Sequence, residues 1–213
     1  MRLLLVVGLW AAVVHADDKP VPLRASGFIS KGTYTIEGRQ KLARGIKLSV
    51  HHNTRIVGKG DGAVLEVEGT LKVTGVEGGR VIFENLTIEL AERFNDVNID
   101  NAKFKGVGGI RTSSRKAVSG KLHIEEVDFE RGCPIDLTFQ AGTIDFLNTS
   151  FLASVNVKCV KPPQAKRNMV RVSVQSCQSR SGIARGLFID GANDCCPYRK
   201  RDPIAESTIQ RSR

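Results

Sequence analysis

The chain has 213 residues, of which 41% are hydrophobic, 25% charged and 6% aromatic, with 21 glycines and only 7 prolines. These values exclude a collagen-like chain, a small disulfide scaffold and a wholly disordered protein, and a chain of this length can bury a substantial core. The formal net charge is +10, and most of it lies in residues 160–213, which hold 11 basic and 4 acidic side chains. Because the basic residues are not distributed along the whole chain, we expect no specific nucleic-acid partner.

The first 16 residues have the pattern of a secretory signal peptide. Arg2 supplies the positive start, residues 3–14 form an apolar run, and the small residue Ala16 precedes the expected cleavage before Asp17. A membrane anchor, which is the alternative, needs roughly 20 apolar residues, and this run is shorter. We therefore expect an exported protein, secreted or periplasmic, without a transmembrane segment.

Residues 17–31 form a polar leader, and strand signals begin at Gly32. Short alternations of β-branched residues, as at 32–36, 46–50 and 64–67, are interrupted by glycine or by polar pairs. Helical periodicity is nearly absent. The sequence therefore predicts an all-β domain.

Four six-residue segments share one template and begin 16, 25 and 22 residues apart. The segments are Phe83–Ile88, Ile99–Phe104, Ile124–Phe129 and Phe146–Phe151. Their apolar first, fourth and sixth residues can face inward together only if the chain bends at the third residue.

The third residue of the template has the chemistry of a bend. Asparagine tolerates the left-handed backbone region better than most residues other than glycine. Three of the four segments have asparagine there, namely Asn85, Asn101 and Asn148, and the fourth has Glu126. We expect these asparagines to form a structural bend ladder, with hydrogen bonds between stacked side chains.

The strand, asparagine bend and strand of this template resemble the right-handed parallel β-helix of the pectate-lyase-like superfamily. Residues 69–75 followed by 81–88 are similar to its early coils, and the nearest likeness is to secreted bacterial β-helix proteins. The resemblance implies a single-stranded right-handed parallel β-helix of about five to six coils over residues 32–174. A β-sandwich with coincidental spacing is the alternative.

If the four segments stack about 4.8 Å apart, their second residues form one outward column. This column contains the carboxylates of Glu84, Asp100 and Glu125, which would repel one another without a positive partner. The candidate ligand is a calcium ion, held by oxygen atoms. The alternative is solvation of the carboxylates together with nearby lysines such as Lys103 and Lys121.

The residues that follow the four segments would form a second outward column. They alternate in charge in the order Glu89, Lys105, Glu130 and Leu152. We interpret this column as a ladder of surface salt bridges, each contributing less than about 1 kcal/mol.

The catalytic motifs of the enzymes in the pectate-lyase-like superfamily have no counterpart in this chain. The calcium-binding carboxylates and arginine base of pectate lyases cannot be placed residue by residue, nor can the aspartate triad of polygalacturonases. His51 and His52 lack a partner at zinc spacing and indicate a polar turn. We therefore expect no catalytic residue and no cofactor other than the candidate calcium.

The five cysteines leave at least one thiol unpaired. Cys159 and Cys177 could form a disulfide on neighbouring coils, or both could be small buried hydrophobic residues. Cys133, Cys195 and Cys196 suggest no pairing of their own.

Residues 175–213 change in character, because the coil pattern stops and basic residues accumulate. We interpret this segment as a poorly ordered basic tail, and a reading-frame error that shortens a longer β-helix is the alternative.

The preferred functional interpretation is an exported, non-catalytic protein that binds carbohydrate or another polymer at the cell surface. Aromatic platforms for sugar rings are scarce in this sequence, since the only tryptophan, Trp10, lies in the expected signal peptide. The alternative is a small or truncated calcium-dependent polysaccharide lyase that uses Glu84, Asp100 and Glu125.

Overall fold

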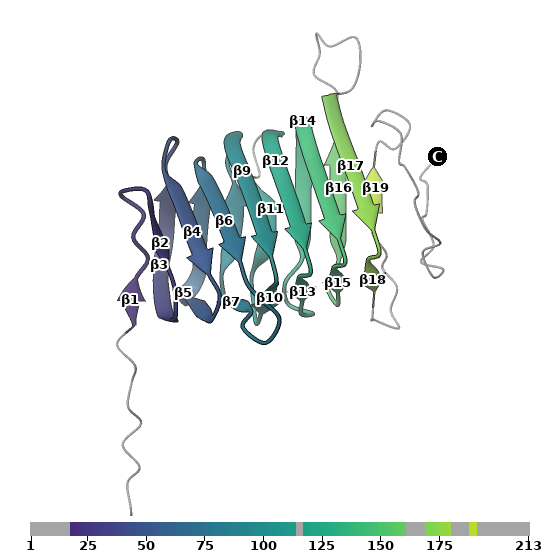
Figure 1. The fold of residues 1–213 in the computed structure, drawn as a ribbon. Helices are drawn as coiled ribbons and strands as arrows, with labels where there is room; N and C mark the ends of the chain where they lie inside the picture. Colours follow the sequence, from purple (N-terminus) through teal and green to yellow (C-terminus); the bar gives the residue numbers. More distant parts are fainter. Residues whose placement is uncertain (1–17, 114–116, 161–168, 180–187, 191–213) are drawn as a thin grey trace, which may run out of the picture.

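The computed structural model describes residues 18–113, 117–160, 169–179 and 188–190. Within these residues the chain forms 19 β-strands and no helix. The strand pairings are parallel, and successive turns of the chain stack as a parallel β-solenoid of about six turns (Figure 1). The all-β fold predicted from the sequence is confirmed. The β-sandwich alternative is wrong, because the strands of a sandwich run antiparallel within each sheet.

Each turn places strands on three faces of the solenoid. Face 1 consists of β2 (Gly27–Ile29), β4 (Lys47–His51), β6 (Thr70–Thr74), β9 (Arg93–Asp100), β12 (Val118–Glu125), the second half of β14 (Ile135–Leu147) and β17 (Met169–Gln175). Face 2 consists of β1 (Lys19–Pro20), the first halves of β3 (Gly32–Leu42) and β5 (Thr54–Val67), β7 (Val81–Glu84), β10 (Ala102–Lys105), β13 (Asp128–Phe129), β15 (Ser150–Phe151) and β18 (Gln178–Ser179). Face 3 consists of the second halves of β3 and β5, β8 (Thr87–Leu90), β11 (Gly109–Thr112), the first half of β14, β16 (Val155–Cys159) and β19 (Phe188–Asp190).

The core fills the space between the three faces with columns of identical or similar side chains. The inward residues of face 2 form a stack of rings, with centroids 4.8 Å apart for Phe83 and Phe104, 4.6 Å for Phe104 and Phe129, and 5.6 Å for Phe129 and Phe151. These phenylalanines are at most 5% exposed. Burial of such large apolar side chains supplies the main stabilisation of the solenoid.

The bend residues lie in the left-handed region. The φ angles of Asn85, Asn101 and Asn148 are 52°, 51° and 48°, and the exception, Glu126, has 53°. At the corner between faces 1 and 2, the backbone N–H of Asn101 donates to the carbonyl of Glu125, and that of Glu126 donates to Leu147. The side-chain amide of Asn101 also donates to the Glu126 carboxylate at 2.5 Å, so glutamate continues the ladder that asparagine begins.

The first of the four template segments does not stack on the other three. Phe83 pairs with Phe104, the last residue of the second segment, and Glu84 pairs with Lys105. Asn85 therefore lies at the corner between faces 2 and 3, where the backbone N–H of Val107 donates to its side-chain oxygen at 3.1 Å. The short first spacing of 16 residues arises because the same template serves two different corners.

The solenoid extends beyond the expected limits of residues 32 and 174. At the N-terminal end, β1 and β2 lie inside the leader 17–31 and pair with β3 and β4. At the other end, β18 and β19 pair with β15 and β16, so solenoid strands continue to residue 190. The expected signal peptide 1–16 and residues 191–213 of the expected tail lie outside the described residues.

Candidate functional site

The carboxylate column that the sequence predicted is only partly formed. Asp100 and Glu125 are direct neighbours on face 1, and Leu147 follows Glu125. Glu84 lies on face 2, where Arg55 donates to its carboxylate from Nε at 2.8 Å. The three candidate cation ligands are therefore not brought together. Among the residues that the structure describes, no group of three or more His, Cys, Asp or Glu side chains could hold a metal ion.

Asp100 and Glu125 form an acidic pair with one adjacent histidine. Nε2 of His123 lies 3.2 Å from the Glu125 carboxylate. Burial, and then the charges of Glu125 and Glu126, raise the pKa of Asp100 above its ordinary value. Ionisation of Asp100 therefore costs folding free energy.

The predicted column of alternating charge, which began with Glu89, is also wrong in its first member, because the first template segment lies one corner away from the expected position. Glu84 replaces Glu89 in the order Glu84, Lys105, Glu130 and Leu152. Lys103, rather than Lys105, forms the ion pair with Glu130, at 3.0 Å. The charges alternate along the column, but the ion pair joins Glu130 to Lys103, which is the register partner of Asp128.

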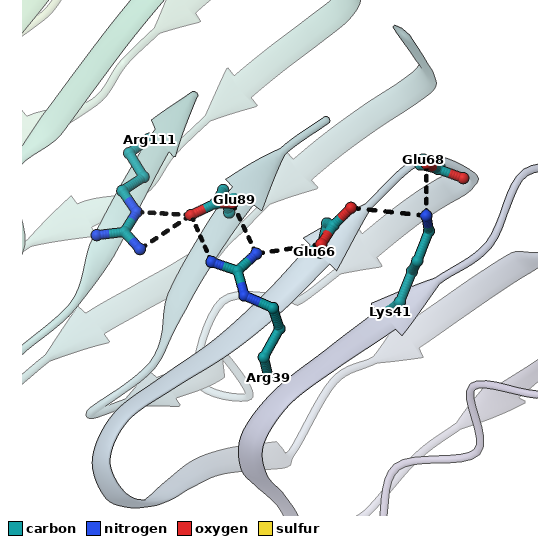
Figure 2. A network of polar contacts seen from close by, with 6 residues as sticks. All are labelled: Arg39, Lys41, Glu66, Glu68, Glu89 and Arg111. Atoms are coloured by element: carbon teal, nitrogen blue, oxygen red, sulfur yellow. Dashed lines mark hydrogen bonds and ion pairs between the residues drawn. The ribbon is translucent and has the colours of Figure 1, made fainter. Parts of the chain in front are cut away.

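Glu89 lies on face 3 at the centre of a network of charged side chains (Figure 2). Arg39 donates to its two carboxylate oxygens at 2.7 and 3.2 Å, and Arg111 donates from Nε at 2.9 Å. Arg39 also contacts Glu66 at 3.1 Å. Because these residues come from four successive turns, the network ties the turns together and leaves its central carboxylate without a free oxygen.

Face 1 carries a different kind of polar arrangement. One outward residue of each face 1 strand is in register with its counterparts on the neighbouring turns. From β4 to β17 this residue stands between two buried residues. We call this set the face 1 column: Phe28, Ser49, Lys72, Asn98, His123, Asp145 and Ser173. Figure 1 shows its strands side by side along the length of the solenoid.

Of the side chains in the middle of the face 1 column, only His123 has a polar partner among the described residues, namely Glu125. In the part of the chain that the structure describes, Lys72, Asn98 and Asp145 form no side-chain hydrogen bond or ion pair with another residue. The charged groups around Glu89 on face 3 are, by contrast, paired with one another. Face 1 therefore presents donors and acceptors that a ligand can use.

The face 1 column was not predicted, although the sequence contains a signal for it. The same triplet, an apolar residue followed by a polar and then an apolar one, begins at Leu48, Leu71, Val97, Leu122, Ile144 and Val172. Each triplet is short, and only their repetition distinguishes them from ordinary alternation in a strand.

The cysteines do not form the Cys159–Cys177 bridge. Cys159 is disulfide-bonded, whereas Cys133 and Cys177 are free. Burial raises the pKa of the Cys133 thiol to about 11. It also raises the pKa of Cys177, so neither thiol has the character of an activated nucleophile. Cys195 and Cys196 lie outside the described residues.

His51 and His52 each contact a neighbouring side chain. The ring of His51 meets the ring of Phe28 edge-on, with centroids 5.9 Å apart. Nδ1 of His52 lies 3.2 Å from the side-chain amide of Asn53, which has a φ of 57° in the turn.

Comparisons with known proteins give no relative for this chain. No family model matches it, and neither a curated protein nor a solved structure matches it. Within the described residues, no helix is long and apolar enough to cross a membrane.

Proposed function

We propose that this chain is an exported, non-catalytic β-helix protein, similar in type to the pectate-lyase-like superfamily, that binds an extended polymer along face 1. The polymer is carbohydrate or another polar polymer of the cell surface. The observation that supports this proposal is the face 1 column, with one outward side chain per turn at a repeat of about 4.8 Å.

A linear polymer suits this surface better than a small molecule. The outward side chains form a flat row rather than a pocket, and small-molecule sites are concave. Each polar side chain can make one or two hydrogen bonds, each contributing about 0.5–1.5 kcal/mol. Useful affinity therefore requires a ligand that contacts several turns together.

The lyase alternative receives less support from the same geometry. It requires Glu84, Asp100 and Glu125 to share a cation, and Glu84 instead contacts Arg55 on face 2. We therefore place the ligand on face 1 and propose no bond cleavage there.

The test is retention of the protein on immobilised polymers. The panel contains a β-1,4-glucan, a β-1,3-glucan, a polygalacturonate and an alginate, each with calcium and with chelator. We expect retention of the wild type on at least one polysaccharide, without release of shortened chains. Calcium-dependent release of unsaturated products would overturn the non-catalytic proposal.

A matched pair of double variants tests whether face 1 carries the binding. Asn98→Ala with Asp145→Ala removes two members of the face 1 column. Asn156→Ala with Asp136→Ala removes the same residue types from face 3, where these two side chains contact each other at 3.1 Å. We expect about a tenfold loss of affinity for the first variant and no loss for the second, because two hydrogen bonds contribute about 1–3 kcal/mol. Equal losses would contradict the assignment to face 1.

A further inference from the structure

Phe28 is an exposed aromatic ring at the end of the face 1 column. Its side chain is 72% exposed, and its register partner on the next turn is Ser49. Of the exposed large hydrophobic side chains among the described residues, Phe28 alone lies within a strand, since Val76, Val107 and Leu152 lie between strands. An outward strand position in water normally favours a polar side chain, so this ring is anomalous where it stands.

The groups around Phe28 combine an aromatic ring with polar atoms. The imidazole of His51 stands at 89° to the ring with centroids 5.9 Å apart. The hydroxyl of Ser49 and the ammonium group of Lys72 follow on the next two turns of the same column. The aromatic ring thus contacts the imidazole of His51 and has the Ser49 hydroxyl one turn away and the Lys72 ammonium group two turns away.

This combination matches the chemistry of a pyranose ring. A pyranose has a face of C–H groups, which carry partial positive charge and are attracted to the negative face of an aromatic ring. Its hydroxyl groups project from the rim and both donate and accept hydrogen bonds. A polypeptide or a polyphosphate backbone has no such apolar face with a hydroxyl rim.

We infer that Phe28, together with His51 and Ser49, forms an aromatic subsite for a sugar ring at the N-terminal end of the face 1 column. This inference rests on the proposed function and deepens it, because it selects carbohydrate among the polymers that the column could bind. The sugar chain then runs along the solenoid axis, with one ring over Phe28 and the following rings beside Ser49 and Lys72.

Tryptophan fluorescence offers a direct test in the full chain. Trp10 is the only tryptophan, so Trp10→Phe provides a silent background. Phe28→Trp in this background places a larger ring and a reporter at the subsite. Val107→Trp in the same background is the matched control, because Val107 is also well exposed, at 76%, but lies between β10 and β11, away from the column.

The probes are oligosaccharides of two to six rings from each polysaccharide of the panel, with polyglutamate and polylysine as polymers without sugar rings. We expect at least one oligosaccharide series to change the emission of the Phe28→Trp protein saturably, with affinity that increases with chain length. The Val107→Trp protein should not respond, and Phe28→Ala should bind about three- to tenfold more weakly than the wild type.

The outcomes separate this inference from the proposed function. Retention on a polysaccharide without an emission change at position 28, or with an unchanged affinity of Phe28→Ala, overturns the subsite and leaves the face 1 column as the binding surface. Retention on polyglutamate or polylysine alone overturns carbohydrate as the ligand class. Neither retention nor an emission change with any probe overturns both proposals.

Discussion

Arg39 and Glu89 are 50 residues apart in the sequence, yet Arg39 contacts both oxygens of the Glu89 carboxylate, at 2.7 and 3.2 Å. The side chain of Glu89 is 7% exposed and that of Arg39 is 50% exposed. A nearly buried carboxylate is tolerated on an outward position of face 3 because Arg39 and Arg111 donate to it from two sides. The network therefore makes the register of the first turns depend on specific charges as well as on apolar packing.

Replacing Glu89 should destabilise the fold. Glu89→Gln keeps the size of the side chain but removes the anionic acceptor of Arg111 and leaves Arg39 with Glu66 alone. Because both arginines can turn to water, we expect a loss of about 1–3 kcal/mol rather than the larger loss of a fully buried pair. Urea unfolding monitored by circular dichroism measures this difference.

Glu130→Gln is the matched control for Glu89→Gln. Within the described part of the chain, Glu130 forms an ion pair with Lys103 alone, and its side chain is 39% exposed. We expect a loss below about 1 kcal/mol. A loss as large as that of Glu89→Gln would contradict the special role of the face 3 network.

The contribution of Glu89 should depend on pH in a defined direction. The hydrogen bond from Arg39, opposed by burial and aided by Arg111, lowers the pKa of Glu89 below its ordinary value. A lowered pKa in the folded state means that the stabilisation is fully present above about pH 4.3, the ordinary value for glutamate, and is lost as the pH falls through the lowered pKa. The difference in Tm between wild type and Glu89→Gln should therefore be constant above about pH 5 and narrow below about pH 4. Thermal melts between pH 3 and pH 7 measure it, and a difference that widens on acidification would contradict this account.

The bends could be predicted from the sequence because their chemistry is local. A left-handed residue between two inward-facing residues is a demanding requirement, and Asn85, Asn101 and Asn148 meet it in segments that also carry the apolar pattern. The parallel solenoid follows from the repetition of these bends. The same locality caused the error at the first segment, since residues 83–86 and 99–102 place an inward residue, an outward carboxylate, an asparagine and an inward residue in the same order at two different corners.

The order Asp100, Glu125 and Leu147 on face 1 was predicted correctly, but the pairings of Glu84 and Glu89 could not be predicted from the sequence, because they depend on the register. A shift of one corner moves Glu84 from the neighbourhood of Asp100 to that of Lys105, and it brings Glu89 into the network of Arg39. The place of Phe28 in the face 1 column was missed for a related reason. The strand Gly27–Ile29 has 3 residues and lies in a segment of polar composition, so only its pairing with β4 places Phe28 in the face 1 column.

Asp100 should behave in the opposite way to Glu89. Burial and the neighbouring carboxylates raise its pKa, so its ionisation costs stability as the pH rises from about 3.9, the ordinary value, through the raised pKa. Asp100→Asn removes this cost. We expect the variant to be more stable than the wild type at pH 7, by less than about 1 kcal/mol, and to lose this advantage near pH 3. Urea midpoints at the two pH values test this, and a variant less stable at pH 7 would show that the carboxylate has a stabilising partner.

A comparison of Gly106 with Gly60 separates two costs of adding a side chain: the strain of a left-handed backbone and the collision of the new Cβ atom with a neighbour. Both have left-handed φ angles, 73° and 76° respectively. A Cβ atom at Gly60 would have no heavy atom within 4 Å, whereas one at Gly106 would lie 2.1 Å from Oδ1 of Asn85. That oxygen accepts the hydrogen bond from the backbone of Val107, so it cannot move without losing this contact.

Alanine at each of the two positions should therefore have different costs. Gly60→Ala carries only the cost of a left-handed alanine, about 1–2 kcal/mol. Gly106→Ala adds the collision and the loss of the Asn85 hydrogen bond, which together contribute about 1–3 kcal/mol more. The double variant Gly106→Ala with Asn85→Gly removes the obstructing side chain. It should recover the part of the additional loss that comes from the collision, but not the part that comes from the hydrogen bond to Val107. Urea unfolding of the three variants measures these terms. Equal losses for the two single variants, or no recovery in the double variant, would contradict the close packing of Asn85 against Gly106 at this corner.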